Sequence, residues 1–495
     1  MTPEPTYHHD RLSALDALLL CAEDDTSPMH VAALMVFEAG PLRNGDGTLD
    51  VGRLQQHVES RLVTLPRYRQ RLEWVPVIEH PVWVDDADFD VRAHVRSVSL
   101  PRPGGREQLE ALVGQLVAPA LDRARPLWEM YVIDGLEGDR FALVSKVHHC
   151  IVDGVLGAAV IAAVLDMEPK NEVADLEPWV ARPAPRPIEL LRQEVRHRGH
   201  VTAGLLRRGL KWFEHGDEEV RAGQVREVLG GLLSYLKAVV PASHTPFNPP
   251  RIGPRRGFHW TRLDMERIKA LRRRVGCTIN DVVVAVVAGA VRRFLLGRDV
   301  DVEGLDFRIM VPVSEHHTGA DMAEGNRVSI MIVRLPVDEG DPAERMRRAV
   351  VAMREAKESK QSDALALVEE LGDWTTAPLV AEAGRRIMHL RPFNMVVTNV
   401  PGPPMPLYMV GAPLLEAYPL VPLFVNTGVG LALLSYAGHL GIGVNTDPDS
   451  VPGASGMVEA LEKAFEELDR AIAFTDEAPS AGGERSTETR TRQPG

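Results

Sequence analysis

Two adjacent histidines, followed closely by an aspartate and a glycine, are the residues best suited to chemistry in this sequence. The stretch 144–154 reads VSKVHHCIVDG, so a strand-like segment ends in His148 and His149, and Asp153 and Gly154 follow. A histidine at a strand end can face a cleft, and its neutral ring can accept a hydroxyl proton near pH 7. His149 is therefore a candidate general base. The alternative is a pair of strand-end histidines with satisfied hydrogen bonds and no chemical role.

The surrounding residues indicate how such a base would be held. Asp153 can fold back across the turn and lock the loop through an arginine or backbone amides, and Gly154 permits tight packing or a positive φ where the next helix starts. No GxSxG nucleophile motif occurs in the sequence. The Cys150 side chain is expected to point away from His149 if the strand alternation continues. Proton transfer without a covalent intermediate is therefore expected.

The elements that must position these residues form two α/β patterns. In the first, we predict strands at 31–37, 128–134 and 141–148, and helices at 51–64, 107–121 and 154–167. In the second, we predict helices at 264–275, 280–296, 341–358 and 455–473, and strands at 307–313, 327–335, 394–399 and 429–445. The expected organisation is an N-terminal domain at 1–180, a Pro/Arg-rich helical linker at 181–255, a C-terminal domain at 256–475 and a disordered tail at 476–495.

Composition excludes several classes of protein. The net charge of −13 argues against a nucleic-acid-binding protein, which needs a basic face. No uncharged apolar run of about 20 residues occurs, so no membrane-spanning helix is expected, and the polar N-terminus does not resemble a signal peptide. Three scattered cysteines form no disulfide or metal pattern, and His316-His317 has no third ligand at helical spacing. We expect a cytoplasmic protein without a bound metal or cofactor.

One basic, apolar stretch, 188–213, has two interpretations. It can pack across both domains as a strap. It can instead lie on an anionic membrane or lipid-droplet surface, with Arg192, Arg196 and Arg198 among its basic residues. Peripheral membrane contact therefore stays open.

The sequence resembles the bacterial wax ester synthases/acyl-CoA:diacylglycerol acyltransferases, whose hallmark is HHxxxDG. Residues 148–154, HHCIVDG, match that motif completely. The segment 12–34 resembles the family's N-terminal signature, Pro126-Leu127-Trp128 its PLW block, and Asn280-Asp281 its ND block. Two later blocks, around 325–328 and 399–403, are also similar. These five blocks follow the family's order, and the similarity covers nearly the whole chain.

The resemblance implies two chloramphenicol-acetyltransferase-like domains, each a mixed sheet flanked by helices, with the active site in a tunnel between them. By the same resemblance, His149 matches the catalytic base, His148 its less critical neighbour, and Asp153 a loop-fixing residue. Asn280 is either a donor to the developing oxyanion or the N-cap of its helix, where Asp281 would be favourable. Trp128 is expected to fill the core beside the histidine strand.

The implied reaction is transfer of a long-chain acyl group from acyl-CoA to a lipid alcohol, either diacylglycerol or a fatty alcohol, giving triacylglycerol or wax ester. The alternative is a condensation-domain-like or polyketide-associated acyltransferase that takes its acyl group from a carrier-protein thioester. A non-enzymatic lipid-droplet protein is a third possibility, against which the intact histidine motif argues.

Overall fold

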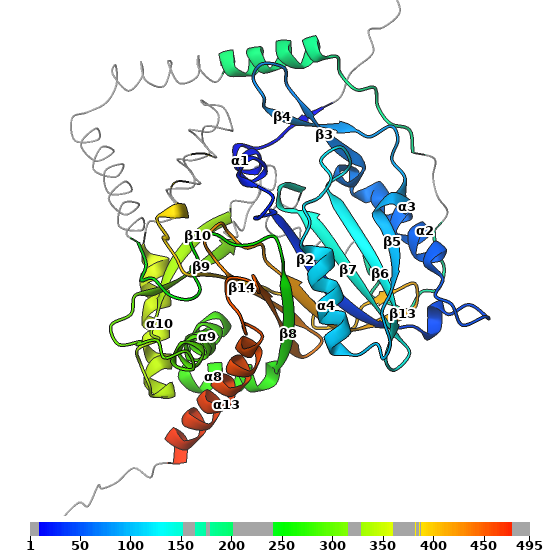
Figure 1. Ribbon diagram of the computed structural model, residues 1–495. Coiled ribbons are helices and arrows are strands. Elements are labelled where there is room, and N and C mark those ends of the chain that lie inside the picture. The colour runs from blue at the N-terminus through cyan, green and yellow to red at the C-terminus, as the bar shows by residue number, and fades with distance from the viewer. Residues whose placement is uncertain are drawn as a thin grey trace, which may run out of the picture.

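The computed structural model describes residues 9–151, 164–174, 179–200, 241–314, 328–359 and 388–477, with the single positions 382 and 386. Asp153 and Gly154, most of the predicted helix 154–167, the His316-His317 pair and the tail from residue 478 lie outside the described residues. Within them the chain builds mixed sheets flanked by helices, and the predicted α/β fold class is confirmed (Figure 1).

The N-terminal sheet has six strands in the order β12-β13-β2-β7-β6-β5. Its central strand β7 is antiparallel to both neighbours, and β5 runs parallel to β6. Near-continuous burial along β7 explains its run of apolar residues, because both faces of a central strand are covered. The strands are β2 (His30–Glu38), β5 (Val95–Ser99), β6 (Trp128–Leu136), β7 (Arg140–His148), β12 (Tyr408–Met409) and β13 (Ala412–Leu420).

The C-terminal sheet also has six strands, in the order β10-β9-β11-β14-β15-β8. Strand β11 runs parallel to β9 and β14, and the other pairs are antiparallel. The strands are β8 (Gly257–Asp264), β9 (Phe307–Ser314), β10 (Val328–Leu335), β11 (Met395–Val400), β14 (Val429–Tyr436) and β15 (His439–Thr446). A smaller third sheet has the order β1-β4-β3, with β1 (Asp10–Arg11), β3 (Gln70–Trp74) and β4 (Pro81–Asp85).

Helices cover these sheets. The N-terminal half carries α1 (Ala14–Ala22), α2 (Val51–Arg61), α3 (Val91–His94) and α4 (Arg106–Val117), and the C-terminal half carries α8 (Met265–Val275), α9 (Ile279–Leu296), α10 (Pro342–Glu358) and α13 (Gly456–Glu477). A further helix, 187–200, lies over β3 and β4 (Figure 1). The 3-10 turns are η1 (Gly40–Leu42), η2 (Leu62–Thr64), η3 (Pro66–Arg69) and η4 (His149–Ile151). Helix α9 is buried on nearly every turn, as its Val/Ala sequence requires.

The two six-stranded sheets meet where β13 crosses β15. A Cβ at Gly441 would overlap the Ala417 carbonyl oxygen, and a Cβ at Gly443 would overlap that of Pro419. These glycines therefore allow the two backbones to approach closely. Strand β13 belongs to the N-terminal sheet although its residues come from the C-terminal half of the sequence. The domain limits given above therefore stay a prediction, and at least one strand crosses them.

Several predicted elements differ in detail from the observed ones. The predicted strand at 429–445 is a hairpin of β14 and β15, because Ala437 and Gly438 take positive φ values and reverse the chain. The predicted helix at 51–64 ends at Arg61 and continues as η2. Strands β1, β3, β4, β5, β8, β12 and β13 have no counterpart among the sequence predictions.

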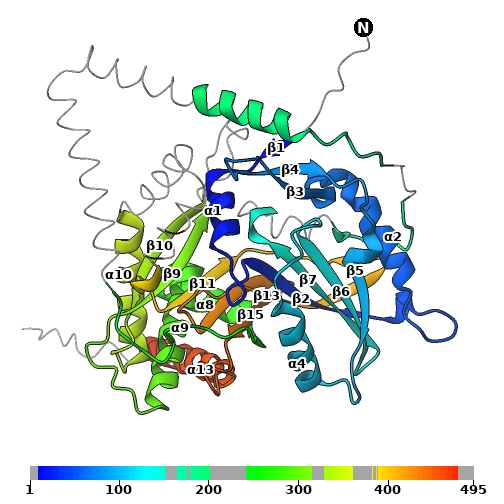
Figure 2. The same cartoon turned by 45° about the horizontal axis from the view of Figure 1, so that its top comes forward.

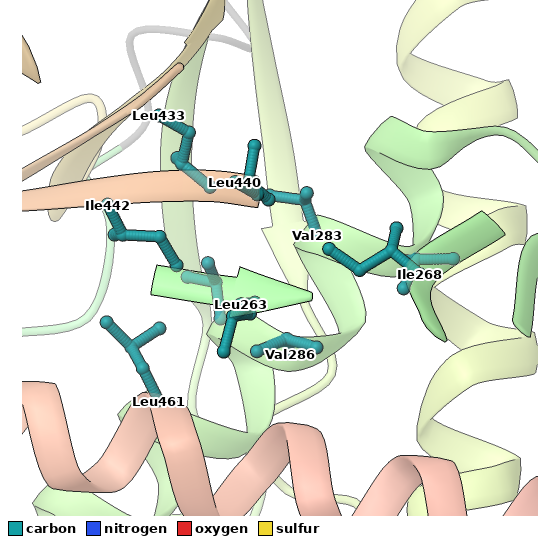
Figure 3. A pocket seen from close by; sticks show the side chains of 10 residues that line it. Leu263, Ile268, Val283, Val286, Leu433, Leu440, Ile442 and Leu461 are labelled. Atoms are coloured by element: carbon teal, nitrogen blue, oxygen red, sulfur yellow. The ribbon is translucent and has the colours of Figure 1, made fainter. Parts of the chain in front are cut away.

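A small cavity lies inside the C-terminal half, between α9, β15 and α13 (Figure 3). Its volume of about 10 Å³ leaves room for at most one water molecule, and only apolar side chains line it, among them Leu263, Val286 and Leu461. It is a packing gap too small for an acyl chain. Within the described residues, no helix is both long and apolar enough to cross a bilayer.

Candidate active site

The histidine pair lies where β7 ends and η4 begins. His148 is the last residue of the strand, and His149 is the first of the 3-10 turn. Two backbone hydrogen bonds hold this point: His148 N donates to Leu127 O at 2.9 Å, and His149 N donates to Met29 O at 2.9 Å. Segments on both sides of the strand therefore fix the turn from which the His149 ring projects.

This turn is close to the junction of the two halves of the molecule. Turn η4 packs against α1, and α1 lies between the two halves in both views (Figures 1 and 2). The segment after α1 also reaches the C-terminal half, because the Arg256 guanidinium donates to Thr26 O. The candidate base therefore lies beside the contact between the halves.

His148 is buried, and both of its ring nitrogens have polar neighbours. Its Nδ1 accepts a hydrogen bond from Cys150 N at 3.1 Å, so the proton of the neutral ring belongs on Nε2. That Nε2 lies 3.4 Å from Glu23 Oε2, an electrostatic contact without good hydrogen-bond alignment. With a side chain only 1% exposed, His148 has little surface to offer a substrate. These contacts fit a supporting role better than a chemical one.

His149 differs from its neighbour in being partly exposed. Among the described residues no side chain hydrogen-bonds to the His149 ring, and no described carboxylate fixes it as in a catalytic triad. Burial, followed by the electrostatic effect of the neighbouring His148, lowers the pKa of His149 below its ordinary 6.5. The ring is therefore neutral at pH 7 and able to accept a proton.

Cys150 does not behave as the strand alternation suggested. The strand ends at His148, so Cys150 lies within the 3-10 turn, and its Sγ is 2.9 Å from His148 Nδ1. The premise of a continuing strand was wrong. Burial, together with nearby Asp16 and Glu23, raises the pKa of the Cys150 thiol well above 9. The thiolate that nucleophilic attack requires is thus disfavoured.

Charged and titratable side chains gather behind the pair, on the same face of β7. Lys146 is 1% exposed, and its Nζ donates to Pro119 O at 2.6 Å and lies 3.5 Å from Glu129 Oε2. His30 pairs with His148 across the strands and lies 2.9 Å from Val117 O through Nε2. Burial and then Lys146 lower the pKa of His30 to about 3. These groups anchor the end of α4 beneath the strand.

The Pro126-Leu127-Trp128 block lies beside the histidine strand. Leu127 and Trp128 are fully buried, and Trp128 Nε1 donates to Tyr68 O at 2.8 Å. The indole also stacks on His94 with ring centroids 4.6 Å apart. Because Leu127 O accepts a hydrogen bond from His148 N, this block fixes the end of β7 next to the start of β6.

Asn280 and Asp281 open helix α9, but neither is its N-cap. Thr278 is the N-cap, and its side chain and that of Asp281 form a reciprocal capping box, with Asp281 Oδ2 accepting from Thr278 N at 2.8 Å. The N-cap interpretation of Asn280 was therefore wrong. Asn280 Oδ1 instead accepts from Asn399 Nδ2 at 2.7 Å. Two sequence blocks noted separately, around 280 and around 399, thus meet in the fold.

Asp153 and Gly154 lie outside the described residues, so their predicted roles are untested. The arginine partner of Asp153 stays open for the same reason. Sequence reasoning did not single out Glu23, which contacts His148, or the pairing of Asn280 with Asn399. Glu23 does lie inside the N-terminal block 12–34, which was the available signal.

The lowered pKa of His149 predicts how activity depends on pH. A base must be deprotonated to act, so kcat/KM should reach half its maximum below pH 6.5 and fall about tenfold per pH unit below the lowered pKa. Initial rates across pH 4.5–8, in buffers of constant ionic strength, measure this profile. Half-maximal kcat/KM at a pH above 6.5 would contradict a base in this environment.

Sequence comparison gives this arrangement a context. Residues 12–283 match the wax ester synthase/diacylglycerol acyltransferase catalytic domain, and residues 324–469 match the WS/DGAT C-terminal domain. The chain belongs to this family. It is an acyltransferase of the wax ester synthase/diacylglycerol acyltransferase type.

Individual relatives agree with this assignment. The chain is 32% identical over 496 residues to a putative diacylglycerol O-acyltransferase of Mycobacterium tuberculosis, covering 97% of this chain and 93% of the relative. It is also similar to the solved wax ester synthase/diacylglycerol acyltransferase from Marinobacter aquaeolei VT8, with 26% identity, a TM-score of 0.66, and coverage of 94% and 100%. The acyltransferase thus shares both sequence and fold with that family.

A more distant structure shows the fold alone. The trichothecene 15-O-acetyltransferase from Fusarium sporotrichioides is 12% identical, with a TM-score of 0.58 and coverage of 94% and 95%. The fold is therefore shared with acyltransferases outside the family, and the reaction of this chain has to be argued from its own site.

Proposed function

We propose that this acyltransferase moves a long-chain acyl group from a coenzyme A thioester to the hydroxyl of a lipid alcohol, with His149 as general base. The acceptor is diacylglycerol or a fatty alcohol, and the product is triacylglycerol or wax ester. The observation that carries the proposal is the partly exposed, neutral imidazole of His149, held by backbone bonds at the end of a central strand. The names of the relatives supply the substrate classes.

The transfer is direct. As the alcohol oxygen bonds to the thioester carbonyl carbon, His149 takes the hydroxyl proton. When the carbon–sulfur bond breaks, the imidazolium returns that proton to the departing thiolate, so the protein ends unchanged. Asn280 is proposed as the donor to the oxyanion, because Asn399 occupies its Oδ1 and leaves its amide N–H groups for another acceptor. Neither a metal nor a cofactor is required by this route.

The test supplies purified protein with labelled palmitoyl-CoA and either diolein or hexadecanol. Formation of labelled triacylglycerol or wax ester supports the proposal, and the ratio of the two products identifies the preferred acceptor. If neither acceptor gives an ester but the acyl group is transferred from an acyl carrier-protein thioester, the proposal is wrong and the carrier-protein reaction takes its place.

Helix 187–200 is the described part of the basic stretch, and the strap across both domains stays a prediction because residues 201–213 lie outside the described residues. Its inner face packs on the third sheet, where Leu190 is buried against Val75, Val82 and Val84. Glu194 lies 3.1 Å from Arg11 and 2.9 Å from Arg198, so Arg198 faces inward.

The outer face of the same helix is exposed. It carries Arg192 and Arg196 beside Ile188 and Val195, which are 60% and 57% exposed. Basic and apolar side chains in this arrangement suit an anionic lipid surface. We propose that this outer face is a peripheral membrane contact.

Replacing Arg192 and Arg196 together by Gln is expected to weaken binding to anionic vesicles about 30-fold at low salt. The reason is that each basic residue near such a surface contributes about 1 kcal/mol. Co-sedimentation with phosphatidylserine-containing liposomes measures the effect. The control pair is Arg272 and Arg273 on α8, exposed in the C-terminal half. Equal binding by both double variants and the wild type would remove the membrane contact.

A further inference from the structure

Glu23 sits at the centre of the contacts that shape the histidine turn. It is the C-cap residue of α1, and its side chain is only 4% exposed. Burial raises the pKa of Glu23, but His148, the Met29 amide and Arg123 outweigh burial and bring the pKa down to about 2. The carboxylate is therefore ionised at every pH at which the enzyme would work.

One path of contacts runs from Glu23 through Met29 to His149. Glu23 Oε2 accepts a hydrogen bond from Met29 N at 2.8 Å. The carbonyl oxygen of the same Met29 accepts from His149 N at 2.9 Å. The residue that receives the His149 amide is thus itself tied to the carboxylate.

A second path runs through the ring of His148. Glu23 Oε2 lies 3.4 Å from His148 Nε2, and His148 Nδ1 accepts from Cys150 N at 3.1 Å. The contact with Glu23 favours the tautomer that leaves Nδ1 free to accept this bond. The backbone N–H groups of His149 and Cys150 are therefore both linked to the Glu23 carboxylate, one through Met29 and the other through His148.

Arg123 holds the carboxylate from the other side. Its Nη2 donates to Glu23 Oε1 at 3.0 Å and to Leu20 O, in the last turn of α1, at 2.7 Å. Neither oxygen of Glu23 is left without a partner. Rotation of the carboxylate would break contacts on both oxygens at once.

We propose that Glu23 is a positioning residue, which fixes the 3-10 turn so that the His149 ring faces the reacting alcohol. His148 transmits one of the two paths and is a positioning residue as well. The inference rests on the proposed role of His149 as base. On this inference, an acidic residue of the N-terminal segment supports the reaction without contacting the substrate.

Three substitutions separate the two paths. Glu23→Gln keeps an oxygen for the Met29 amide but removes the charge that faces His148. Glu23→Ala removes both paths. His148→Asn leaves an oxygen near the place of Nδ1 for the Cys150 amide but ends the contact with Glu23.

Each variant is expected to keep KM within about twofold of the wild type while kcat falls. A misplacement of about 1 Å costs up to about 10²-fold, so the expected loss is largest for Glu23→Ala. The double variant of Glu23→Gln with His148→Asn should have a kcat within about twofold of that of the less active single variant. The reason is that both changes break the same path.

The matched control is Asp85→Asn. Asp85 is 6% exposed, has a pKa lowered to about 2, and is bonded to Arg182, but it lies in β4 and does not contact the histidine turn. Its loss should lower the melting temperature and leave kcat unchanged.

Kinetics with palmitoyl-CoA and the better acceptor, together with melting temperatures, decide the matter. If the Glu23 variants lose only melting temperature, as the control does, or if their effects on kcat multiply with that of His148→Asn, the positioning role is wrong. Should Glu23→Ala fail to fold, Glu23→Gln carries the comparison alone. Absence of acyl transfer by the wild type would instead reject the proposed function.

Discussion

His149→Ala is expected to lower turnover of palmitoyl-CoA by about 10²–10⁴-fold, the contribution of a positioned general base. The melting temperature should stay near that of the wild type, because the ring has no side-chain partner in the described part of the chain and is partly exposed. Steady-state rates with saturating acceptor, together with thermal unfolding, measure both quantities.

His439→Ala provides the control. His439 also lies at a strand end, at the start of β15, but it is exposed and belongs to the C-terminal sheet. This variant should keep wild-type turnover. Near-normal turnover in His149→Ala would show that the base is another group or that none is needed.

Trp128→Ala is expected to destabilise the protein by about 3–5 kcal/mol, the range for removing a large buried side chain. The indole is fully buried, its Nε1 bonds to Tyr68 O, and its ring stacks on His94. The carbonyl oxygen of the neighbouring Leu127 accepts the hydrogen bond from His148 N. The rate of acyl transfer should therefore fall also at temperatures at which the variant is still folded. Urea unfolding and the acyl-transfer rate at low temperature test both effects.

Trp74 serves as the comparison. It is 37% exposed, at the end of β3, so Trp74→Ala should cost only about 1 kcal/mol or less. A loss for Trp128→Ala no larger than that for Trp74→Ala would contradict the structural role of the Pro126-Leu127-Trp128 block.

The place of the histidine pair was predictable because its signal is local. The strand predicted at 141–148 is mostly apolar up to Val147 and ends at the histidine pair, and β7 spans Arg140–His148. The two hairpin strands β6 and β7 were predicted for the same reason. Apolar periodicity within one segment determines such elements without knowledge of distant residues.

Contacts between distant segments could not be predicted in this way. Strand β13 pairs with β2 across most of the chain, and nothing in residues 412–420 indicates that partner. The bond between Asn280 and Asn399 joins residues 119 positions apart. Both depend on how the sheets come together, which local patterns do not encode.

Two other features were present in the sequence, but the predictions made from them were wrong. Thr278 and Asp281 have the spacing of a capping box, which predicts the N-cap at Thr278, two residues before Asn280. The strand was assumed to continue through Cys150, whereas bonds to Met29 O and to the His148 ring fold residues 149–151 into a turn. Tertiary hydrogen bonds thus override the alternation expected of an isolated strand.

Direct transfer is tested by release of coenzyme A in the absence of any alcohol. Purified protein is mixed with a stoichiometric amount of palmitoyl-CoA, free thiol is followed in the pre-steady state, and the intact protein mass is recorded. We expect no burst of thiol and an unchanged mass until diolein or hexadecanol is added, after which thiol and ester appear in equal amounts. A burst before addition, with the protein heavier by one palmitoyl group, would show a covalent acyl-enzyme and contradict His149 acting on the alcohol directly.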